Sequence, residues 1–311
     1  MSSSHLPRPR PRTALLAPTA LAAVLALGAC GGGDDEAGRD GPGTPTGGTA
    51  ADASKSGANA APRYARYVAL GDSFAALGPT AAPTSGPQAC HRSSRNYASL
   101  LAERPDVGEL VDVTCGGAET PDMTAPQIVE TPPQFDALTH DTDLVTLSIG
   151  GNDIGFGAMV ECIVQTPRAA AGSPCRDRLE LPVTGALDGL GDRLDTVYAG
   201  IRERSPDARV VTTAYLPLVP ADGGCDFVSR MSPGDITWTR AVTERINRIV
   251  TDAAGRAGAE AVLPEDARER SACAAPDVRY TDFTGVETGS HPMHPTAAGH
   301  RAMADAVGAV L

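Results

Sequence analysis

The sequence predicts an α/β protein in which helices cover both faces of a parallel sheet. Short apolar runs, typical of buried strands, alternate at least four times with segments whose apolar residues recur at helical spacing. Several of these runs stop at glycine or proline, which interrupt regular structure. The expected strands are residues 66–70, 110–114, 143–149, 208–215 and 261–263.

The helices are predicted from apolar residues three or four positions apart. Residues 94–104 place Tyr97, Leu100 and Leu101 on one face. Pro295 is expected to open a C-terminal helix, because proline suits the first helical position. Two further helices are marked by the series Leu187, Leu190, Leu194, Val197 and Ile201, and by Trp238, Val242, Ile246 and Ile249.

The first 63 residues are predicted to lie outside the fold. Residues 1–29 look like a secretory signal peptide, because a basic stretch precedes the uncharged residues 13–29, which are too few to span a membrane comfortably. The letters LGAC resemble a bacterial lipobox, in which cleavage leaves a lipidated Cys30; the alternative is an ordinary signal peptide cut near Ala29. Residues 30–63 are rich in Gly, Pro, Ala and Asp and predict a disordered tether.

Residues 64–311 are expected to form one folded domain of ordinary size. Lys and Arg number 26 and Asp and Glu 38, and the net charge of −12 argues against a nucleic-acid partner. Six cysteines remain when Cys30 is set aside, and an even number in an exported chain predicts three disulfides. None forms a CxxC pair, so a zinc ribbon is not expected, and spacing alone leaves all fifteen pairings open.

Chemically useful side chains follow three predicted strands and precede the last predicted helix. In open parallel sheets, ligands bind beyond the carboxyl ends of the strands. Ser73 would supply a nucleophile there, and His294 would accept its proton, because an alcohol is a weak nucleophile without a base. The backbone N–H groups of Ser73 and Gly117 and the side-chain amide of Asn152 would stabilise an oxyanion.

Four sequence blocks carry a family resemblance. The blocks GDSFAALG, the glycine after the second strand, GGND and HPMHPTAAGH resemble those of the SGNH (GDSL) hydrolases over about residues 66–311. Each block alone is a weak or moderate signal, but all four occur in order. The resemblance is strongest to secreted, disulfide-bonded actinobacterial lipases and esterases. It implies a five-stranded parallel sheet in a three-layer α/β/α sandwich.

The resemblance also implies residue roles and a disulfide pattern. The family's roles fall on Ser73, Gly117, Asn152 and His294, with Gly117 preferred to Gly116 because the family glycine usually lies two places after the cysteine. The relatives pair their cysteines sequentially. That order implies the disulfides Cys90–Cys115, Cys162–Cys175 and Cys225–Cys273.

One position departs from the family pattern. The usual block is Asp-x-x-His, whereas His291 stands three places before His294. Some actinobacterial relatives lack that Asp and use the backbone carbonyl at the same position. We therefore expect a Ser–His dyad in which the main-chain oxygen of His291 holds the Nδ1 proton of His294. A remote acid, Asp282 or Glu287, is the less favoured alternative.

Other side chains near these motifs are given structural interpretations. Asp72 and Asp153 are expected to bind nearby backbone N–H groups. His291, His294 and His300 lack a matching carboxylate or cysteine cluster, so neither a metal nor a cofactor is expected.

The combined motifs predict a serine esterase or lipase that hydrolyses acyl esters through an acyl-enzyme. The chain has no Gly-x-Ser-x-Gly elbow, no dinucleotide-binding Gly-x-Gly-x-x-Gly and no P-loop. The alternatives are a carbohydrate O-deacetylase of the same fold and a non-catalytic ligand-binding surface lipoprotein. The expected partners are an acyl-ester or lipid substrate and, through a lipid anchor, a membrane. The protein is expected to be a monomer, exported and either anchored to the outer face of the cytoplasmic membrane or secreted.

Overall fold

The computed structural model describes residues 61–167 and 171–311. The predicted signal peptide, Cys30 and nearly all of the predicted tether lie outside the described residues. Within the described residues, no helix is both long enough and apolar enough to cross a membrane.

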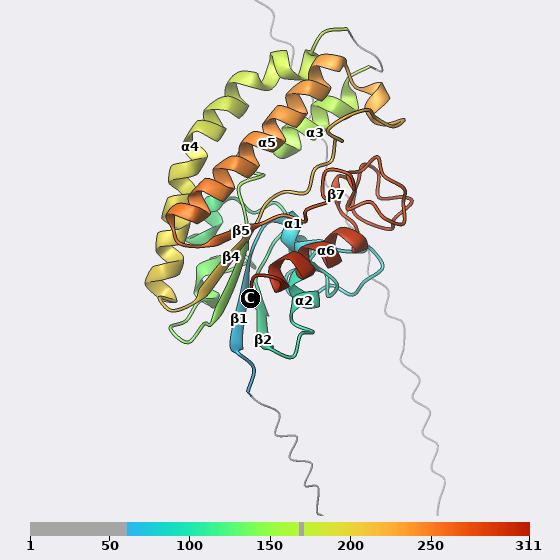
Figure 1. Ribbon diagram of the computed structural model, residues 1–311. Coiled ribbons are helices and arrows are strands. Elements are labelled where there is room, and N and C mark those ends of the chain that lie inside the picture. Colours follow the sequence, from blue (N-terminus) through green and yellow to red (C-terminus); the bar gives the residue numbers. More distant parts are fainter. Residues whose placement is uncertain (1–60, 168–170) are drawn as a thin grey trace, which may run out of the picture. The chain divides into compact units, whose positions relative to one another are not determined.

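A five-stranded parallel sheet lies at the centre of the domain (Figure 1). Its order is β2-β1-β3-β4-β5, so β3 is the central strand and β1 lies inside the sheet between β2 and β3. The sheet confirms the predicted architecture, and each predicted strand overlaps an observed one. The strands are β1 (Tyr64–Gly71), β2 (Val107–Asp112), β3 (Leu144–Ser148), β4 (Arg209–Thr213) and β5 (Glu260–Val262).

Helices cover the two faces of this sheet and complete the three layers. The long helices α4 (Pro174–Arg204) and α5 (Pro233–Arg256) pack together over one face, and α2 (Tyr97–Leu101) packs with α6 (Ala297–Gly308) over the other (Figure 1). Alternate side chains of β1 enter the two apolar cores, as the two-residue period of a strand requires. The remaining helices are α1 (Ser73–Ala76), α3 (Phe156–Gln165) and the 3₁₀ turns η1 (Gln88–Cys90), η2 (Thr120–Met123), η3 (Gln134–Ala137) and η4 (Val228–Arg230).

The start of the last helix differs from the expectation. Pro295 does not open it: α6 begins at Ala297, and the Thr296 side chain caps it by accepting the N–H of Gly299. His294 and Pro295 instead form a two-residue strand, β7 (His294–Pro295), antiparallel to β6 (Thr281–Asp282). Capping by threonine therefore sets the helix boundary two residues beyond the proline.

Three disulfides join Cys90 to Cys115, Cys162 to Cys175 and Cys225 to Cys273. The sequential pairing implied by the family resemblance is confirmed. Disulfides persist in oxidising compartments, so their number indicates that this domain is exported.

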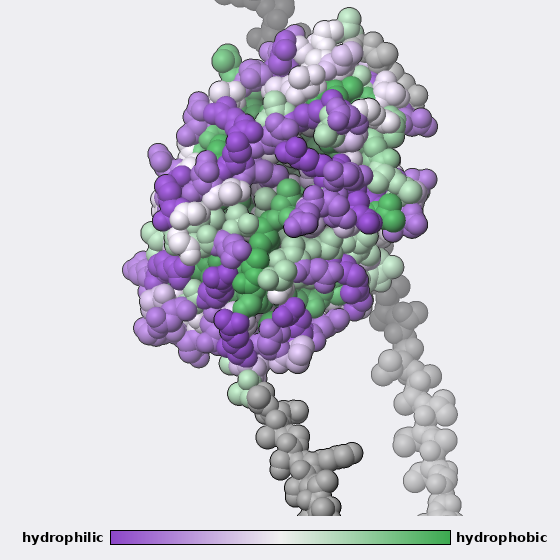
Figure 2. Space-filling model, viewed as in Figure 1, coloured by the Kyte–Doolittle hydropathy of each residue, from purple (hydrophilic) through white to green (hydrophobic). Residues whose placement is uncertain are grey.

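The edge strand β5 is flanked by grooves. Ala261, Val262 and Leu263 line a groove toward α5 and another toward α6. Figure 2 shows an apolar band across the middle of this face of the molecule. Neither groove is lined by Ser73 or His294, so both lie apart from the predicted chemistry.

Candidate active site

The turn after β1 presents Ser73. Gly71 ends the strand at φ +148°, and a Cβ there would lie 2.4 Å from the carbonyl oxygen of Ser148, so the close approach of β3 requires glycine. Asp72 then caps α1 by accepting the N–H of Phe74 at 2.9 Å, as predicted. Ser73 is the first residue of this short helix and is 9% exposed, so its hydroxyl is held in one place rather than free in solvent.

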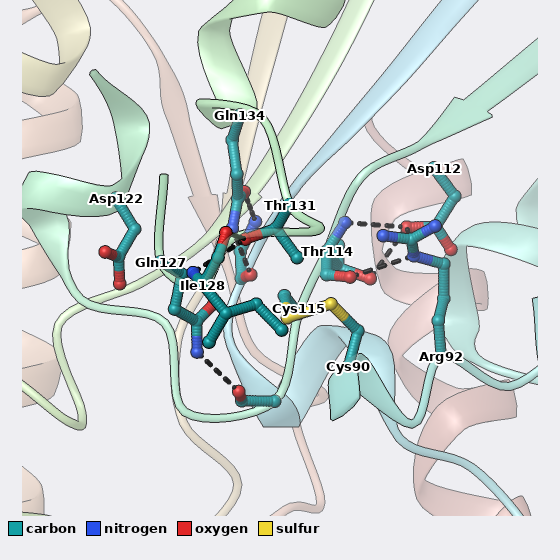
Figure 3. The surroundings of a disulfide bond; sticks show 12 residues. Cys90, Arg92, Asp112, Thr114, Cys115, Asp122, Gln127, Ile128, Thr131 and Gln134 are labelled. Carbon is teal, nitrogen blue, oxygen red and sulfur yellow. Dashed lines mark hydrogen bonds and ion pairs between the residues drawn. A yellow bond between two sulfur atoms is a disulfide. The ribbon is translucent and has the colours of Figure 1, made fainter. Parts of the chain in front are cut away.

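Gln134, in the segment between β2 and β3, binds the backbone of this turn. The N–H of Gly71 donates to its Oε1 at 2.7 Å, and its Nε2 donates to the Gly71 carbonyl at 3.0 Å (Figure 3). Gln134 is buried, so the two bonds are shielded from competing water. Sequence reasoning missed this residue because it lies in no motif.

The β6–β7 pair brings the predicted base to the nucleophile. His294 Nε2 lies 2.8 Å from Ser73 Oγ, although 221 positions separate the two in sequence. β7 packs against both α1 and α6, which fixes the histidine beside the end of β1 (Figure 1). The predicted Ser–His pairing is therefore present in the fold.

The orienting carbonyl is not the one expected. His294 Nδ1 hydrogen-bonds the carbonyl of Pro292 at 2.6 Å, whereas the His291 carbonyl accepts the backbone N–H of His294 at 3.3 Å. Met293 adopts φ +62°, and this left-handed residue turns the Pro292 carbonyl toward the ring. A carbonyl can only accept, so Nδ1 carries the hydrogen and Nε2 faces Ser73 with a lone pair.

The two remote acids considered as alternatives contact an arginine instead. Arg279 Nη2 lies 2.5 Å from Asp282 Oδ2 and 2.8 Å from Glu287 Oε2. Thr288 also donates to Asp282, at 2.8 Å. Asp282 pairs with His294 through the β6–β7 backbone register, not through its side chain.

The environment of His294 keeps its imidazole neutral. The pKa of His294 is lowered to about 4, mainly by burial and to a smaller extent by the nearby His291, while the hydrogen bond to the Pro292 carbonyl opposes this shift. The rings of Phe74 and Phe156 lie 5.4 and 6.3 Å from the imidazole and supply this apolar surrounding. A neutral imidazole is the form that can accept a proton.

The loop after β2 distinguishes the two candidate glycines. The N–H of Gly116 donates to the Cys90 carbonyl at 3.0 Å, and Gln127 donates to the Gly116 carbonyl at 2.8 Å (Figure 3). Within residues 61–167 and 171–311, the N–H of Gly117 has no hydrogen-bond partner, and this glycine has φ +79°. Of the two glycines, Gly117 is therefore the one whose backbone N–H is available to a ligand.

Asn152 and Asp153 follow β3 and tie it to the same loop. Asn152 Nδ2 donates to the Ala118 carbonyl at 2.9 Å, which leaves its second amide hydrogen available. Asp153 accepts the N–H of Thr120 at 3.0 Å, as its structural interpretation predicted. Together these bonds hold Asn152 beside the end of β2.

Residues 69–302 match the GDSL-like Lipase/Acylhydrolase family. The chain belongs to this family. It is 35% identical over 259 residues to Lipase 2 of Streptomyces coelicolor, covering 80% of this chain and 88% of the relative. It is therefore a carboxylic ester hydrolase.

Two solved structures show the same fold. The extracellular lipase of Streptomyces rimosus aligns with a TM-score of 0.66 at 25% identity, covering 79% of this chain and all of that one. Phospholipase A1 of Streptomyces albidoflavus aligns with a TM-score of 0.59 at 26% identity, covering 79% of this chain and 99% of that one.

In this GDSL-like hydrolase, an apolar cavity opens beside Ser73. Its volume is about 70 Å³. Ser73 and Asn152 are among its lining residues, and other parts of its wall come from α3, from the segment after β4 and from α5. The main apolar lining residues are Ile154, Phe156, Met159, Leu216, Leu218, Val242 and Ile246.

The histidines of the C-terminal block do not form a metal site. His294 faces Ser73, and the buried His300 accepts the N–H of Tyr97 at 3.1 Å through Nδ1. In the two described ranges, no three His, Cys, Asp or Glu side chains are grouped as metal ligands.

Sequence reasoning also missed Tyr215. It follows β4, lines the cavity and donates to Asp72 Oδ2 at 2.5 Å. The rule that site residues follow parallel strands could have indicated it, because it stands two positions beyond Thr213.

Proposed function

We propose that Ser73 and His294 hydrolyse esters of short apolar acids through a covalent acyl-enzyme. The observation that carries this proposal is the 2.8 Å contact between His294 Nε2 and Ser73 Oγ at the mouth of an apolar cavity. The distance is that of a hydrogen bond along which a proton moves to a base.

In the first half-reaction, Ser73 Oγ bonds to the ester carbonyl carbon while its proton passes to His294 Nε2. The carbonyl oxygen becomes an oxyanion, which accepts hydrogen bonds from the N–H groups of Ser73 and Gly117 and from the Asn152 amide. When the tetrahedral intermediate collapses, the C–O bond of the leaving alcohol breaks and the alcohol takes the proton from His294.

In the second half-reaction, water replaces the alcohol. His294 accepts a proton from water, whose oxygen attacks the acyl carbon, and collapse returns the proton to Ser73 Oγ and releases the acid. The Pro292 carbonyl keeps the ring oriented throughout, since it holds the Nδ1 hydrogen at 2.6 Å. As a neutral dipole, it stabilises the imidazolium less than a carboxylate would.

The cavity supports a short acyl chain. Its volume of about 70 Å³ is roughly half that of an engineered apolar cavity of about 150 Å³ that accepts benzene. Aliphatic and aromatic side chains line it, and such a surface favours an alkyl chain over a sugar. Butyryl esters should therefore be better substrates than palmitoyl esters.

The test compares the wild-type domain with Ser73→Ala on a series of p-nitrophenyl esters. Ser73→Ala should lower kcat by about 10⁴-fold or more, the scale seen when a nucleophile of such a unit is removed. A fluorophosphonate should label Ser73. The matched control is Ser229→Ala, whose exposed hydroxyl donates only to the Asp226 carbonyl.

Three results would contradict the proposal. Labelling of another serine would exclude Ser73 as nucleophile. A preference for acetylated glycans over alkyl esters would indicate a carbohydrate O-deacetylase. Binding of esters without turnover would indicate a ligand-binding lipoprotein.

We further propose that the exported protein is lipidated at Cys30, after removal of residues 1–29, and tethered through residues 30–63. The LGAC sequence supports this anchor, and a diacylglyceryl group would hold the protein more firmly than one acyl chain. Cys30→Ser should move the protein from the membrane fraction to the soluble fraction; unchanged membrane binding would exclude the lipid anchor. Because all four proposed site residues come from one chain, a monomer suffices for catalysis.

A further inference from the structure

The hydroxyl of Tyr215 joins two loops of the proposed catalytic centre. It accepts the N–H of Gly151 at 2.7 Å and donates to Asp72 Oδ2 at 2.5 Å. Gly151 precedes the proposed oxyanion residue Asn152, and Asp72 precedes the proposed nucleophile Ser73. One phenol, coming from the end of β4, therefore links the ends of β3 and β1.

The direction of these hydrogen bonds follows from Gly151. A backbone N–H can only donate, so Tyr215 accepts from it and must place its own hydrogen on Asp72. The other oxygen of Asp72 accepts the N–H of Phe74 at 2.9 Å. Both oxygens thus act as acceptors, which is the arrangement of an ionised carboxylate.

Tyr215 is itself firmly fixed. Asn247 of α5 brackets its main chain, accepting its N–H at 2.8 Å and donating to its carbonyl at 2.9 Å. Its ring packs edge-on against Phe74, with centroids 5.1 Å apart. A Cβ on Gly151 would lie 3.1 Å from the ring and hydroxyl, so the glycine allows the close approach.

We propose that Tyr215 is a positioning residue that locks the Asn152 loop to the Ser73 turn, and that this lock requires an ionised Asp72. The inference rests on the proposed function, because it assigns Tyr215 the task of holding the oxyanion donors in register with the nucleophile. Tyr215 acts through Gly151 and Asp72 and does not itself touch the reacting atoms.

The titratable groups around Asp72 set the pH at which the lock forms. The pKa of Asp72 is raised to about 7, mainly by burial and also by the charge of Asp153, while the hydrogen bonds from Tyr215 and Phe74 oppose this shift. Asp153 is paired with Arg193 of α4 at 3.2 Å. Burial and the neighbouring Asp72 raise the pKa of Tyr215, so its hydroxyl keeps its proton.

The remaining titratable neighbours do not replace Asp72. The buried Tyr97 of α2 is also close enough to interact with Asp72, and burial keeps its hydroxyl neutral by raising its pKa. His294, beyond Ser73, loses its proton at lower pH, since burial lowers its pKa to about 4. As pH falls, Asp72 therefore gains its proton first, and activity should decline through about pH 7 before His294 is protonated.

The experiment compares Tyr215→Phe with Tyr198→Phe in the p-nitrophenyl butyrate assay from pH 4 to 9. Tyr198 is an equally buried tyrosine whose hydroxyl bonds only Thr212 Oγ1, at 2.6 Å, away from Ser73. Tyr215→Phe should lower kcat by about tenfold with KM unchanged, because the unlocked Asn152 loop aligns its amide less well with the oxyanion of the transition state. The acidic limb of its pH–rate profile should move toward the lower pKa of His294, because without the hydroxyl the protonation of Asp72 no longer breaks the lock. Tyr198→Phe should change neither.

Asp72→Asn gives a second readout if Tyr215→Phe folds poorly. Its kcat should fall, and its acidic limb should move from about pH 7 toward the lower pKa of His294. Unchanged kcat and acidic limb in Tyr215→Phe, or an unchanged limb in Asp72→Asn, would overturn the lock. Failure of the proposed function is distinguishable, because wild-type protein would then hydrolyse no ester and its Ser73 would not react with a fluorophosphonate.

Discussion

The two partners of the Ser–His pair are held in place by different means. Ser73 follows β1, a buried strand inside the sheet that is hydrogen-bonded to β2 on one side and to β3 on the other. His294 follows an irregular segment, residues 283–293, whose two ends are joined by the two-residue pairing of β6 with β7. Ser73 is thus positioned by the five-stranded sheet, whereas His294 depends on a two-residue strand pair and on contacts within the segment that precedes it.

The histidine segment relies on a buried ion pair and a strained residue. Arg279 and Asp282 are 8% and 3% exposed at their side chains, so both charges depend on each other. Met293 keeps its left-handed conformation while its side chain is buried among Val219, Met231 and Phe283. Strain of this kind persists where the surrounding packing enforces it.

Removing the proposed base should give the largest effect. The comparison with His291→Ala tests whether His294 is the histidine of this segment whose side chain is needed for turnover. His294→Ala should lower kcat by about 10⁴-fold or more, whereas His291→Ala should stay within a few-fold of wild type because the Pro292 carbonyl remains. Steady-state kinetics on a butyryl ester would measure both. A comparable loss in the two variants would show that the side chain of His291 takes part.

Breaking the ion pair should destabilise the histidine segment by the next largest amount. Asp282→Ala leaves the buried Arg279 with only the exposed Glu287, and losing one partner of a buried pair costs about 3–5 kcal/mol. Asp195→Ala is the matched control, because its pairing with Arg256 is solvent-exposed and contributes much less to stability than a buried pair. Urea unfolding would compare the two; equal costs would mean that the Arg279 pair does not hold the segment.

Removing single disulfides should give the smallest effects, and these effects should differ between the loop near Ser73 and the rest of the domain. Replacing Cys90 and Cys115 by alanine should cost about 2–4 kcal/mol and also lower kcat, since the Cys90 carbonyl holds the peptide next to Gly117. Replacing Cys225 and Cys273 opens a loop of 48 rather than 25 residues, which adds about 0.6 kcal/mol to the entropic cost. Unfolding and kinetic measurements on both variants check this, and an unchanged kcat without Cys90–Cys115 would refute the link to the oxyanion loop.

Features set by local sequence patterns could be predicted, whereas features set by contacts between distant residues could not. The strands, the long helices and the sites at strand ends followed from local apolar patterns and from the four motifs. The boundary of α6 did not, because the Thr296 cap competed with the proline signal. Gln134 and Tyr215 also escaped prediction, since each acts on a backbone group far away in the sequence.

By itself, the sequence determined the α/β architecture and the family, and it indicated Ser73 and His294 as the candidate nucleophile and base. Each of these depends on patterns within about five to fifteen residues, where side-chain period and turn chemistry act locally. Only the tertiary structure decided that the carbonyl of Pro292 rather than that of His291 bonds Nδ1 of His294, and that Tyr215 connects Asp72 to Gly151. The reason is that a hydrogen-bond partner in an irregular segment depends on packing between distant parts of the chain, here the burial of Met293 and the clamp of Asn247 on Tyr215.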